Sequence, residues 1–380
     1  METLRKKKLL ILCHCFYPSK NRGGPTVSVT NLVKSLADKF EISVLTTIFE
    51  KGTHDQYTSV KLGKNRLFGS DVYYLEEETP LIIWRMIDRI APDIIYVSSF
   101  YSVSFSLPAM LYRMWKRNIK FVLAPRGEFM RKAQENGKWK KRLYISLLKM
   151  IGAFRGIQFH VTSRQEAQDL EEIFPNHSVF VIGNLSLLQA GDILRPEKVS
   201  GKLRILTLGR IHPIKNIDYA IHILAGLYGE IIFDIYGPKE DDTYFQHCMN
   251  IARELPQNIR VNYCGAIQHD DLQKLYENYH VYFSPTQTEN YGHSIVEAMR
   301  CHCPVVISDR TPWTEVNGQG GFAVKLKDKN AFVRALQAFV DMDNQEYAAC
   351  CDRVFQFISE KDDTGKTVLE YCDMLGAEGI

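Results

Sequence analysis

Two glutamates bracket a glycine in a stretch whose residue types suit the binding of hydroxyl groups. Glu289 and Glu297 have seven residues between them, and Gly292 lies in that interval. An apolar run ends shortly before Glu289, and a helical pattern begins near Gly292. Carboxylates accept paired hydrogen bonds from neighbouring hydroxyls, and a helix start stabilises an anion. One such glutamate is common as dipole compensation, but two around a glycine favour a binding site.

Two cations follow the apolar run 203–208. Gly209 and Arg210 come directly after that run, and Lys215 lies five residues beyond Arg210. Cations at a strand end can flank a diphosphate and neutralise it as it leaves. Two surface cations are the alternative, but the position of Arg210 beside an expected buried strand favours function.

A pair of adjacent glycines, Gly23 and Gly24, lies between the first apolar run and a helical pattern. Such a pair lets backbone N–H groups approach an anion at the helix start, although a plain turn is the alternative. The sequence has no G-x-G-x-x-G pattern, so a dehydrogenase is not favoured.

Polar residues also stand at expected strand ends in the first half. Ser98 and Ser99 end one strand, and Arg126 and Glu128 flank a glycine after the next one. Arg126 and Glu128 are candidates for gripping an acceptor or a sugar. The alternative is a buried structural ion pair between the two.

Two segments resemble metal sites, but we expect no metal at either. Cys301, His302 and Cys303 are adjacent and cannot easily surround one ion. Asp341 and Asp343 lie in a late helical segment, away from any expected strand end, and are interpreted as solvated surface.

Apolar runs alternate with helix-period segments along the chain, which predicts an α/β fold of parallel sheets covered by helices. The expected strands are 9–14, 42–46, 72–75, 94–98, 121–124 and 158–161, then 203–208, 231–236, 261–264, 281–284 and 305–308. We therefore expect two Rossmann-like domains, residues 1–185 and 203–357, with a linker at 186–202 and a C-terminal helix within 358–380 that can return to the first domain.

The length of 380 residues suits two domains, and the apolar fraction of 45% with 24% charged residues is that of a globular protein. The net charge is only +3, but residues 1–160 hold 27 Lys and Arg against 13 Asp and Glu. Residues 161–380 hold 20 against 31. The first part should therefore meet something anionic, which can be phosphate, a membrane surface or nucleic acid.

Many of these cations lie between Arg113 and Arg155. The densest group is Lys138, Lys140, Lys141 and Arg142, next to Trp139 and a following apolar run. This pattern is typical of a segment that lies on an anionic membrane. The alternative is an ordinary solvated helix that packs through Leu143, Leu147 and Ile151. No nucleic-acid recognition motif accompanies the charge, so nucleic acid is not an expected partner.

The order of these elements resembles the retaining glycosyltransferases of the GT-B fold, in the large glycosyl transferases group 1 family of polysaccharide and envelope enzymes. The resemblance rests on the Gly23-Gly24 loop, the Gly209 to Lys215 segment, the Glu289–Glu297 pair and the following run 304–309. It covers most of the chain and implies two Rossmann-like domains that face each other across a cleft.

The resemblance also implies roles for individual residues. Glu297 would hold the ribose hydroxyls, Glu289 would face the donor sugar, and Arg210 and Lys215 would take the diphosphate. Backbone amides near the helix start would meet sugar hydroxyls and phosphate oxygens, and the base would stack near Ile267. The amides in question are those of Asn290, Tyr291, Gly292, Ser294 and Ile295. Such enzymes need no metal or other cofactor.

The sequence departs from the family at one position. Many members have a histidine at the end of the strand that corresponds to 94–98, but this chain has Ser98 and Ser99 there. Either a serine hydroxyl substitutes or the acceptor side is organised differently.

The resemblance implies a cytoplasmic enzyme that transfers a sugar, from a UDP-sugar or similar donor, with retention of configuration. The expected acceptor is a saccharide or a lipid-diphosphate-linked sugar, and the expected location includes the inner face of the cytoplasmic membrane. A nucleotide-sugar epimerase of the same fold and a non-catalytic sugar-nucleotide-binding subunit are the alternatives.

Overall fold

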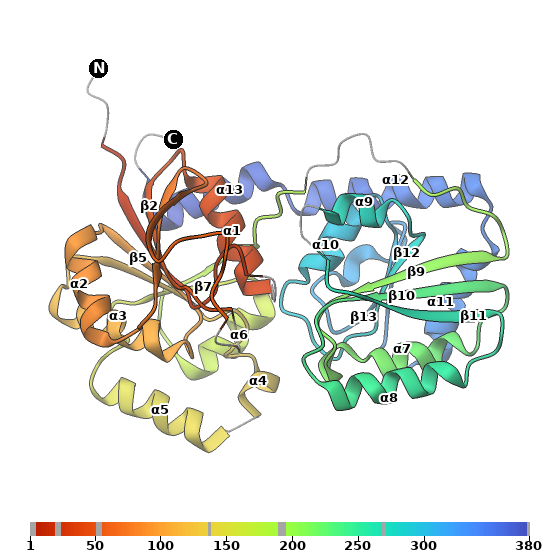
Figure 1. Cartoon of the computed structure of the whole chain (residues 1–380), viewed down its shortest axis with the longest axis horizontal. Helices are drawn as coiled ribbons and strands as arrows, with labels where there is room; N and C mark the ends of the chain where they lie inside the picture. The colour runs from red at the N-terminus through yellow and green to blue at the C-terminus, as the bar shows by residue number, and fades with distance from the viewer. Residues whose placement is uncertain are drawn as a thin grey trace. The chain divides into compact units, whose positions relative to one another are not determined.

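A computed structural model describes residues 5–19, 24–50, 55–135, 138–188, 195–267 and 271–377. The chain divides into two compact units, which Figure 1 shows with their labelled elements. The first unit holds Met1–Leu185 and Thr364–Ile380, and the second holds Ser186–Asp363. The second unit therefore ends after residue 363 and not at the expected 357, because helix α12 (Asn344–Lys361) continues through that position.

The first unit contains an eight-stranded sheet in the order β3-β4-β2-β1-β5-β6-β7-β8. Every pairing in it is parallel except that of β3 with β4. Its strands are β1 Lys8–Leu12, β2 Glu41–Thr47, β3 Gly63–Leu67, β4 Ser70–Leu75, β5 Ile94–Ser98, β6 Lys120–Ala124, β7 Gln158–Val161 and β8 Val179–Val181. Its helices are α1 Gly24–Leu36, α2 Pro80–Ile90, α3 Val103–Trp115, α4 Arg131–Glu135, α5 Lys138–Met150, α6 Arg164–Ile173 and α13 Thr364–Leu375.

The second unit contains a parallel six-stranded sheet in the order β11-β10-β9-β12-β13-β14. Its strands are β9 Lys202–Leu208, β10 Glu230–Tyr236, β11 Ile259–Gly265, β12 Val281–Ser284, β13 Val305–Ser308 and β14 Phe322–Val324. Its helices are α7 Ile217–Leu224, α8 Asp242–Arg253, α9 Leu272–Tyr276, α10 His293–Arg300, α11 Lys329–Asp341 and α12, with short 3-10 turns at Pro213–Lys215 and Thr314–Val316.

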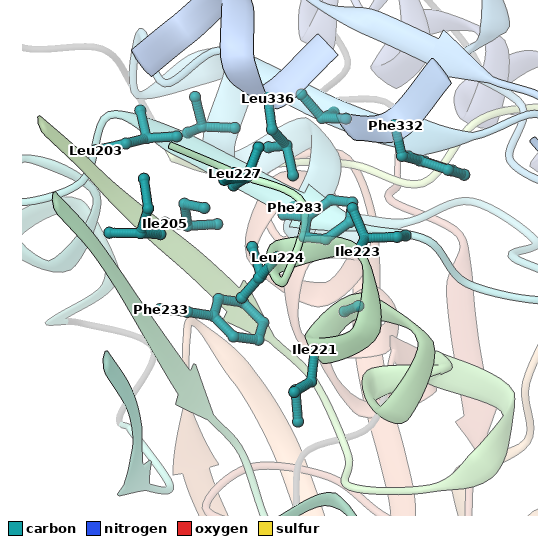
Figure 2. Packing of buried hydrophobic residues seen from close by; sticks show 14 of the residues in the cluster. Leu203, Ile205, Ile221, Ile223, Leu224, Leu227, Phe233, Phe283, Phe332 and Leu336 are labelled. Carbon is teal, nitrogen blue, oxygen red and sulfur yellow. The ribbon is translucent and has the colours of Figure 1, made fainter. Parts of the chain in front are cut away.

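The central strands of each sheet are largely buried on both faces, which explains why most of them are apolar runs. In the second unit one face of the sheet packs against α7, α8 and α11, and the other against α9, α10 and α12. Figure 2 shows the first of these cores, where Phe233 and Phe283 of the sheet lie against Leu224 of α7 and Phe332 of α11. In the first unit α1 and α13 cover one face, and α2, α3, α5 and α6 cover the other. Rigid sheets of this kind hold the loops at their strand ends in place.

Side-chain caps start several helices and account for one metal-like motif. Asp343 caps α12 and forms a reciprocal capping box with Glu346. Asp341 accepts a hydrogen bond from Gln337 at 2.8 Å. The Asp341–Asp343 segment is therefore a junction between two helices.

The other metal-like motif, Cys301 to Cys303, belongs to the core of the second unit. Both cysteines are buried, and the His302 ring stacks on Phe355 with centroids 4.1 Å apart. Within the described ranges, no group of three or more His, Cys, Asp and Glu side chains is placed to hold a metal ion. Among the same residues, no helix has both the length and the apolar character needed to cross a bilayer.

Candidate active site

The loops after β9 and β12 meet at the point where the strand order of the second sheet reverses. Ligands of open α/β sheets bind at such a point, beyond the carboxyl ends of the strands. Several hydrogen bonds hold the two loops together. Asn216 Nδ2 donates to the Pro285 carbonyl at 3.0 Å, and the Gln287 amide and Thr286 hydroxyl donate to the Ile214 carbonyl at 2.9 and 3.0 Å. Residues distant in sequence therefore form one rigid edge.

Lys215 and Glu289 meet at this edge. Lys215 Nζ lies 2.5 Å from Glu289 Oε2, and each side chain is 19% exposed. The Glu289 amide donates to the Arg310 carbonyl at 2.9 Å, which fixes the loop. A Cβ at Gly209 would lie 3.4 Å from Lys215 Cε, so the glycine leaves room for the lysine stem. The pair presents a positive and a negative group side by side.

Arg210 does not join this pair. Its guanidinium forms an ion pair with Glu240, from the loop after β10, and both side chains are 42% exposed. In this arrangement each of the two cations has its own carboxylate, and their joint binding of a diphosphate stays a prediction. Glu240 was missed by the sequence analysis, although it follows the end of a predicted strand.

Gly292 starts α10 in the left-handed conformation, with φ of 81°. A Cβ there would lie 3.1 Å from Glu289 Cγ and 3.0 Å from Ile295 Cδ1, so glycine suits the position on two grounds. The Ile295 amide donates to the Gly292 carbonyl at 2.9 Å, and its contact with a phosphate stays a prediction. The Ser294 hydroxyl lies 2.7 Å from the Tyr282 hydroxyl.

Glu297 is buried one turn further along α10, and burial raises its pKa to about 7. Tyr282 lies within the electrostatic influence of both glutamates. Burial first, and then the charges of Glu289 and Glu297, raise the pKa of the Tyr282 phenol. The charges of both predicted carboxylates therefore act on the hydroxyl of Tyr282 in β12.

The remaining donor-side candidates lie in other parts of the second unit's loops and core. Tyr291 is buried, its hydroxyl donates to Asp362 at 3.0 Å, and its carbonyl accepts from Trp313 at 2.5 Å. Asn290 lies in the loop between β12 and α10. Ile267 follows β11 and packs against the core on the α9 and α10 side of the sheet.

The glycine pair of the first unit is only half described. Gly24 begins α1, and its carbonyl accepts a 2.8 Å hydrogen bond from Ser28 Oγ. Gly23 lies outside the described residues. The prediction of an anion-binding loop there is not addressed by these contacts.

The first unit has its own cavity at the equivalent position, where the strand order reverses between β1 and β5. Its volume is about 580 Å³. The four acceptor-side candidates, Ser98, Ser99, Arg126 and Glu128, all line it. The structure therefore brings together residues that the sequence places in two separate segments.

Arg126 and Glu128 do not pair with each other, so the alternative of a direct ion pair is wrong. Arg126 is held in the left-handed region, with φ of 56°. Its guanidinium donates to Asn184 Oδ1 at 2.5 Å, the Tyr96 hydroxyl at 2.9 Å and Ser98 Oγ at 3.3 Å. The guanidinium is thus hydrogen-bonded to neutral oxygens at one wall of the cavity.

Glu128 bonds to the backbone at the end of β5. Its carboxylate accepts from Ser99 Oγ at 2.5 Å and from the amides of Phe100 and Tyr101 at 2.6 and 3.1 Å. Burial nevertheless raises its pKa above the usual range for a glutamate. These bonds engage both serines, since Ser98 bonds to Arg126 and Ser99 to Glu128.

The same cavity is lined by a histidine that the sequence analysis missed. His14 follows β1, and its Nδ1 lies 3.5 Å from Glu78 Oε1. Ligands of open α/β sheets bind beyond the carboxyl ends of the strands, so the position of His14 after β1 could have identified it as a candidate.

Two family models match consecutive parts of the chain. The model described as "Glycosyltransferase Family 4" matches residues 22–185, and "Glycosyl transferases group 1" matches residues 192–352. O-antigen chain mannosyltransferase B of Escherichia coli is 31% identical over 150 residues, which is 38% of each chain. A UDP-N-acetylglucosamine–peptide N-acetylglucosaminyltransferase GtfA subunit of Streptococcus agalactiae is 27% identical over 33% of this chain and 23% of its own. The alignments thus span less than half of these relatives.

Solved structures resemble the chain over nearly its whole length. HepE of Anabaena in complex with UDP-glucose superposes with a TM-score of 0.74 at 15% identity, covering 97% of this chain and 99% of HepE. Sucrose-phosphate synthase of Thermosynechococcus elongatus gives a TM-score of 0.71 at 16% identity, covering 97% and 98%. At such identities the likeness concerns the fold.

Proposed function

Because this chain belongs to the GT-B glycosyltransferases of the glycosyl transferases group 1 family, we propose that it transfers a sugar from a UDP-sugar to a saccharide or lipid-linked acceptor, with retention of configuration. The observation that carries the proposal is the Lys215–Glu289 pair beside the start of α10, at the reversal point of the second sheet.

The second unit binds the donor in this proposal. Glu297 accepts hydrogen bonds from the vicinal ribose hydroxyls, which a carboxylate can do in pairs. Glu289 contacts the donor sugar, and Lys215 stabilises the diphosphate as its negative charge develops. Arg210 can contribute only if the anion displaces Glu240, which the 42% exposure of both side chains permits. The positive start of α10 adds to this stabilisation. We propose that these groups replace a metal ion.

The first unit binds the acceptor. The cavity of about 580 Å³ combines charged and hydroxyl groups with the apolar side chains of Pro25, Tyr101 and Val103. Sugars offer hydroxyls at their edges and apolar C–H groups on their faces, so such a lining suits a saccharide. Arg126 supplies a positive charge at the wall, which favours an acceptor that carries a phosphate or diphosphate.

Helix α5 presents an exposed apolar stripe that supports a lipid-linked acceptor. Four apolar residues at helical spacing form its outer face. They are Trp139, Leu143, Leu147 and Met150, which are 68%, 52%, 48% and 76% exposed. Its inner face packs through Ile145 and Leu148, which are buried. The alternative of a helix packed through Leu143, Leu147 and Ile151 is therefore wrong.

Cations flank this stripe. Lys140, Arg142 and Lys149 lie on α5, and Lys140 Nζ stands 5.8 Å from the centre of the Trp139 ring. Exposed apolar side chains flanked by cations suit the interface of an anionic bilayer. We propose that α5 lies on the inner face of the cytoplasmic membrane, where a lipid-linked acceptor is found.

A donor panel tests the proposed transfer. Purified protein is incubated with UDP-glucose, UDP-galactose, UDP-N-acetylglucosamine and GDP-mannose, each with and without octyl glycosides as acceptors. We expect nucleotide release that depends on the acceptor and a glycosylated product with retained configuration. A changed nucleotide sugar formed without acceptor would indicate an epimerase, and binding without turnover would indicate a non-catalytic subunit.

A further inference from the structure

His14 is held from several sides at the mouth of the first unit's cavity. Its Nδ1 faces Glu78 Oε1 at 3.5 Å, and its ring packs edge-on to Phe105 with centroids 6.3 Å apart. Its carbonyl accepts a 3.2 Å hydrogen bond from Thr46 Oγ1. Glu78 and Phe105 thus orient the ring, and the hydrogen bond from Thr46 holds its backbone, although the side chain remains 44% exposed.

Glu78 is itself positioned by a second contact. Ser104 Oγ donates to Glu78 Oε2 at 2.5 Å, and the Glu78 side chain is 15% exposed. Burial acts to raise the pKa of Glu78, but the hydrogen bonds from His14 and Ser104 prevail and hold that pKa below its usual range. An ionised carboxylate only accepts hydrogen bonds, so it selects the tautomer of His14 that carries its proton on Nδ1.

The selected tautomer leaves Nε2, on the opposite side of the ring, as a hydrogen-bond acceptor. His14 lines the cavity together with Ser98, Ser99, Arg126 and Glu128. Those two serines bond to the arginine and the glutamate, so neither hydroxyl is placed as a simple substitute for the histidine that is missing at the end of β5. The imidazole of His14 comes from the segment after another strand, β1, and lines the same cavity.

We propose that His14 binds the acceptor hydroxyl through Nε2, and that Glu78 is a positioning residue which orients the imidazole. The inference rests on the proposed transfer to a saccharide acceptor and names the residue that recognises the reacting hydroxyl. The Nδ1–H group of His14 keeps facing the Glu78 carboxylate, while Nε2 accepts a hydrogen bond from the acceptor hydroxyl. The ligand of His14 is a hydroxyl group of a saccharide, and its binding requires no other ligand or cofactor.

The test compares His14→Phe, His14→Gln and Glu78→Gln with the wild type, using the octyl glycoside that the wild type glycosylates fastest. Loss of one hydrogen bond to substrate should raise the acceptor KM about tenfold in His14→Phe while the donor KM stays unchanged. His14→Gln keeps an acceptor atom and should recover part of this loss. His222→Phe, at an exposed histidine of the second unit, is the matched control.

Glu78→Gln separates positioning from a structural role. It should raise the acceptor KM in the wild-type background but not in the His14→Phe background, because its effect passes through the imidazole. Equal effects in both backgrounds would overturn the positioning role, and an unchanged acceptor KM in His14→Phe would overturn the role of His14. Absence of transfer by the wild type with every donor and acceptor would instead overturn the proposed function.

Discussion

Lys215 Nζ lies 2.5 Å from Glu289 Oε2, although 73 residues separate them in the chain. The pair exists because β9 and β12 are neighbours in the sheet, so the loops that follow them share one edge. Both side chains are only 19% exposed, and their charges interact more strongly than in water. In the proposed function a donor diphosphate would compete with Glu289 for the lysine, so its binding would be coupled to rearrangement of this pair.

Removal of the Glu289 carboxylate should abolish most transfer. We expect Glu289→Ala to lower kcat/KM by about two to three orders of magnitude, as for other groups that stabilise a transition state. The measurement is acceptor-dependent nucleotide release. Glu254→Ala, at an exposed position of the same unit, is the control. Transfer at the wild-type rate would refute the assignment of the donor site.

Removal of the Lys215 charge should weaken stabilisation of the diphosphate leaving group. Lys215→Ala should lower kcat about 100-fold and weaken the binding of UDP, because a diphosphate loses its cation. Calorimetry with UDP measures the second effect directly. Lys325→Ala, which removes an exposed lysine of the same unit, should change neither quantity. Unaltered UDP affinity in Lys215→Ala would contradict the proposed contact.

The stability of the donor loop should depend on Gly237. A Cβ there would lie 1.8 Å from the Gly209 carbonyl oxygen, and φ is 142°. Gly237→Ala should therefore lower the free energy of unfolding by more than about 2 kcal/mol. Gly318→Ala also has a positive φ but meets nothing within 4 Å, so it should cost only about 1 kcal/mol. Urea unfolding of both variants checks the difference, and equal losses would show that the close approach is unimportant.

The buried Glu297 should make stability depend on pH. Its pKa of about 7 in the folded protein lies above the usual 4.5, so the unfolded chain releases this proton first as the pH rises. The folded state is therefore progressively disfavoured between about pH 4.5 and 7, by about 3 kcal/mol in all. Glu297→Gln lacks this penalty, and its stability relative to the wild type should grow from pH 5 to pH 8. A difference that does not vary with pH would contradict the raised pKa.

Binding to anionic vesicles should depend on α5. The double variant Lys140→Glu/Arg142→Glu, and separately Leu143→Ser/Leu147→Ser, should reduce cosedimentation with phosphatidylglycerol vesicles at least tenfold. Their controls are Lys327→Glu and Leu369→Ser, at exposed positions outside α5. Vesicle binding that is unchanged in both α5 variants would reject the proposed membrane surface.

The apolar pattern of the sequence was enough to predict the class of the fold and most of its strands. Buried parallel strands are continuous apolar runs, and the predicted bounds of β5, β7, β12 and β13 agree with the structure. The sequence missed β3, β8 and β14. The first of these is polar and antiparallel, and the other two are only three residues long. The Glu289–Glu297 pair could also be recognised in the sequence, because both glutamates and Gly292 lie in one short segment.

Tertiary structure alone decided the partners of the charged residues and the exposed face of α5. Helix α5 has two apolar stripes at helical spacing, and only packing against the sheet selects Ile145 and Leu148 for burial. Likewise Arg126, Glu128 and His14 take their partners from strands and loops far away in sequence. Periodicity reports which residues share a face, but the neighbour of that face depends on the order of strands in the sheet.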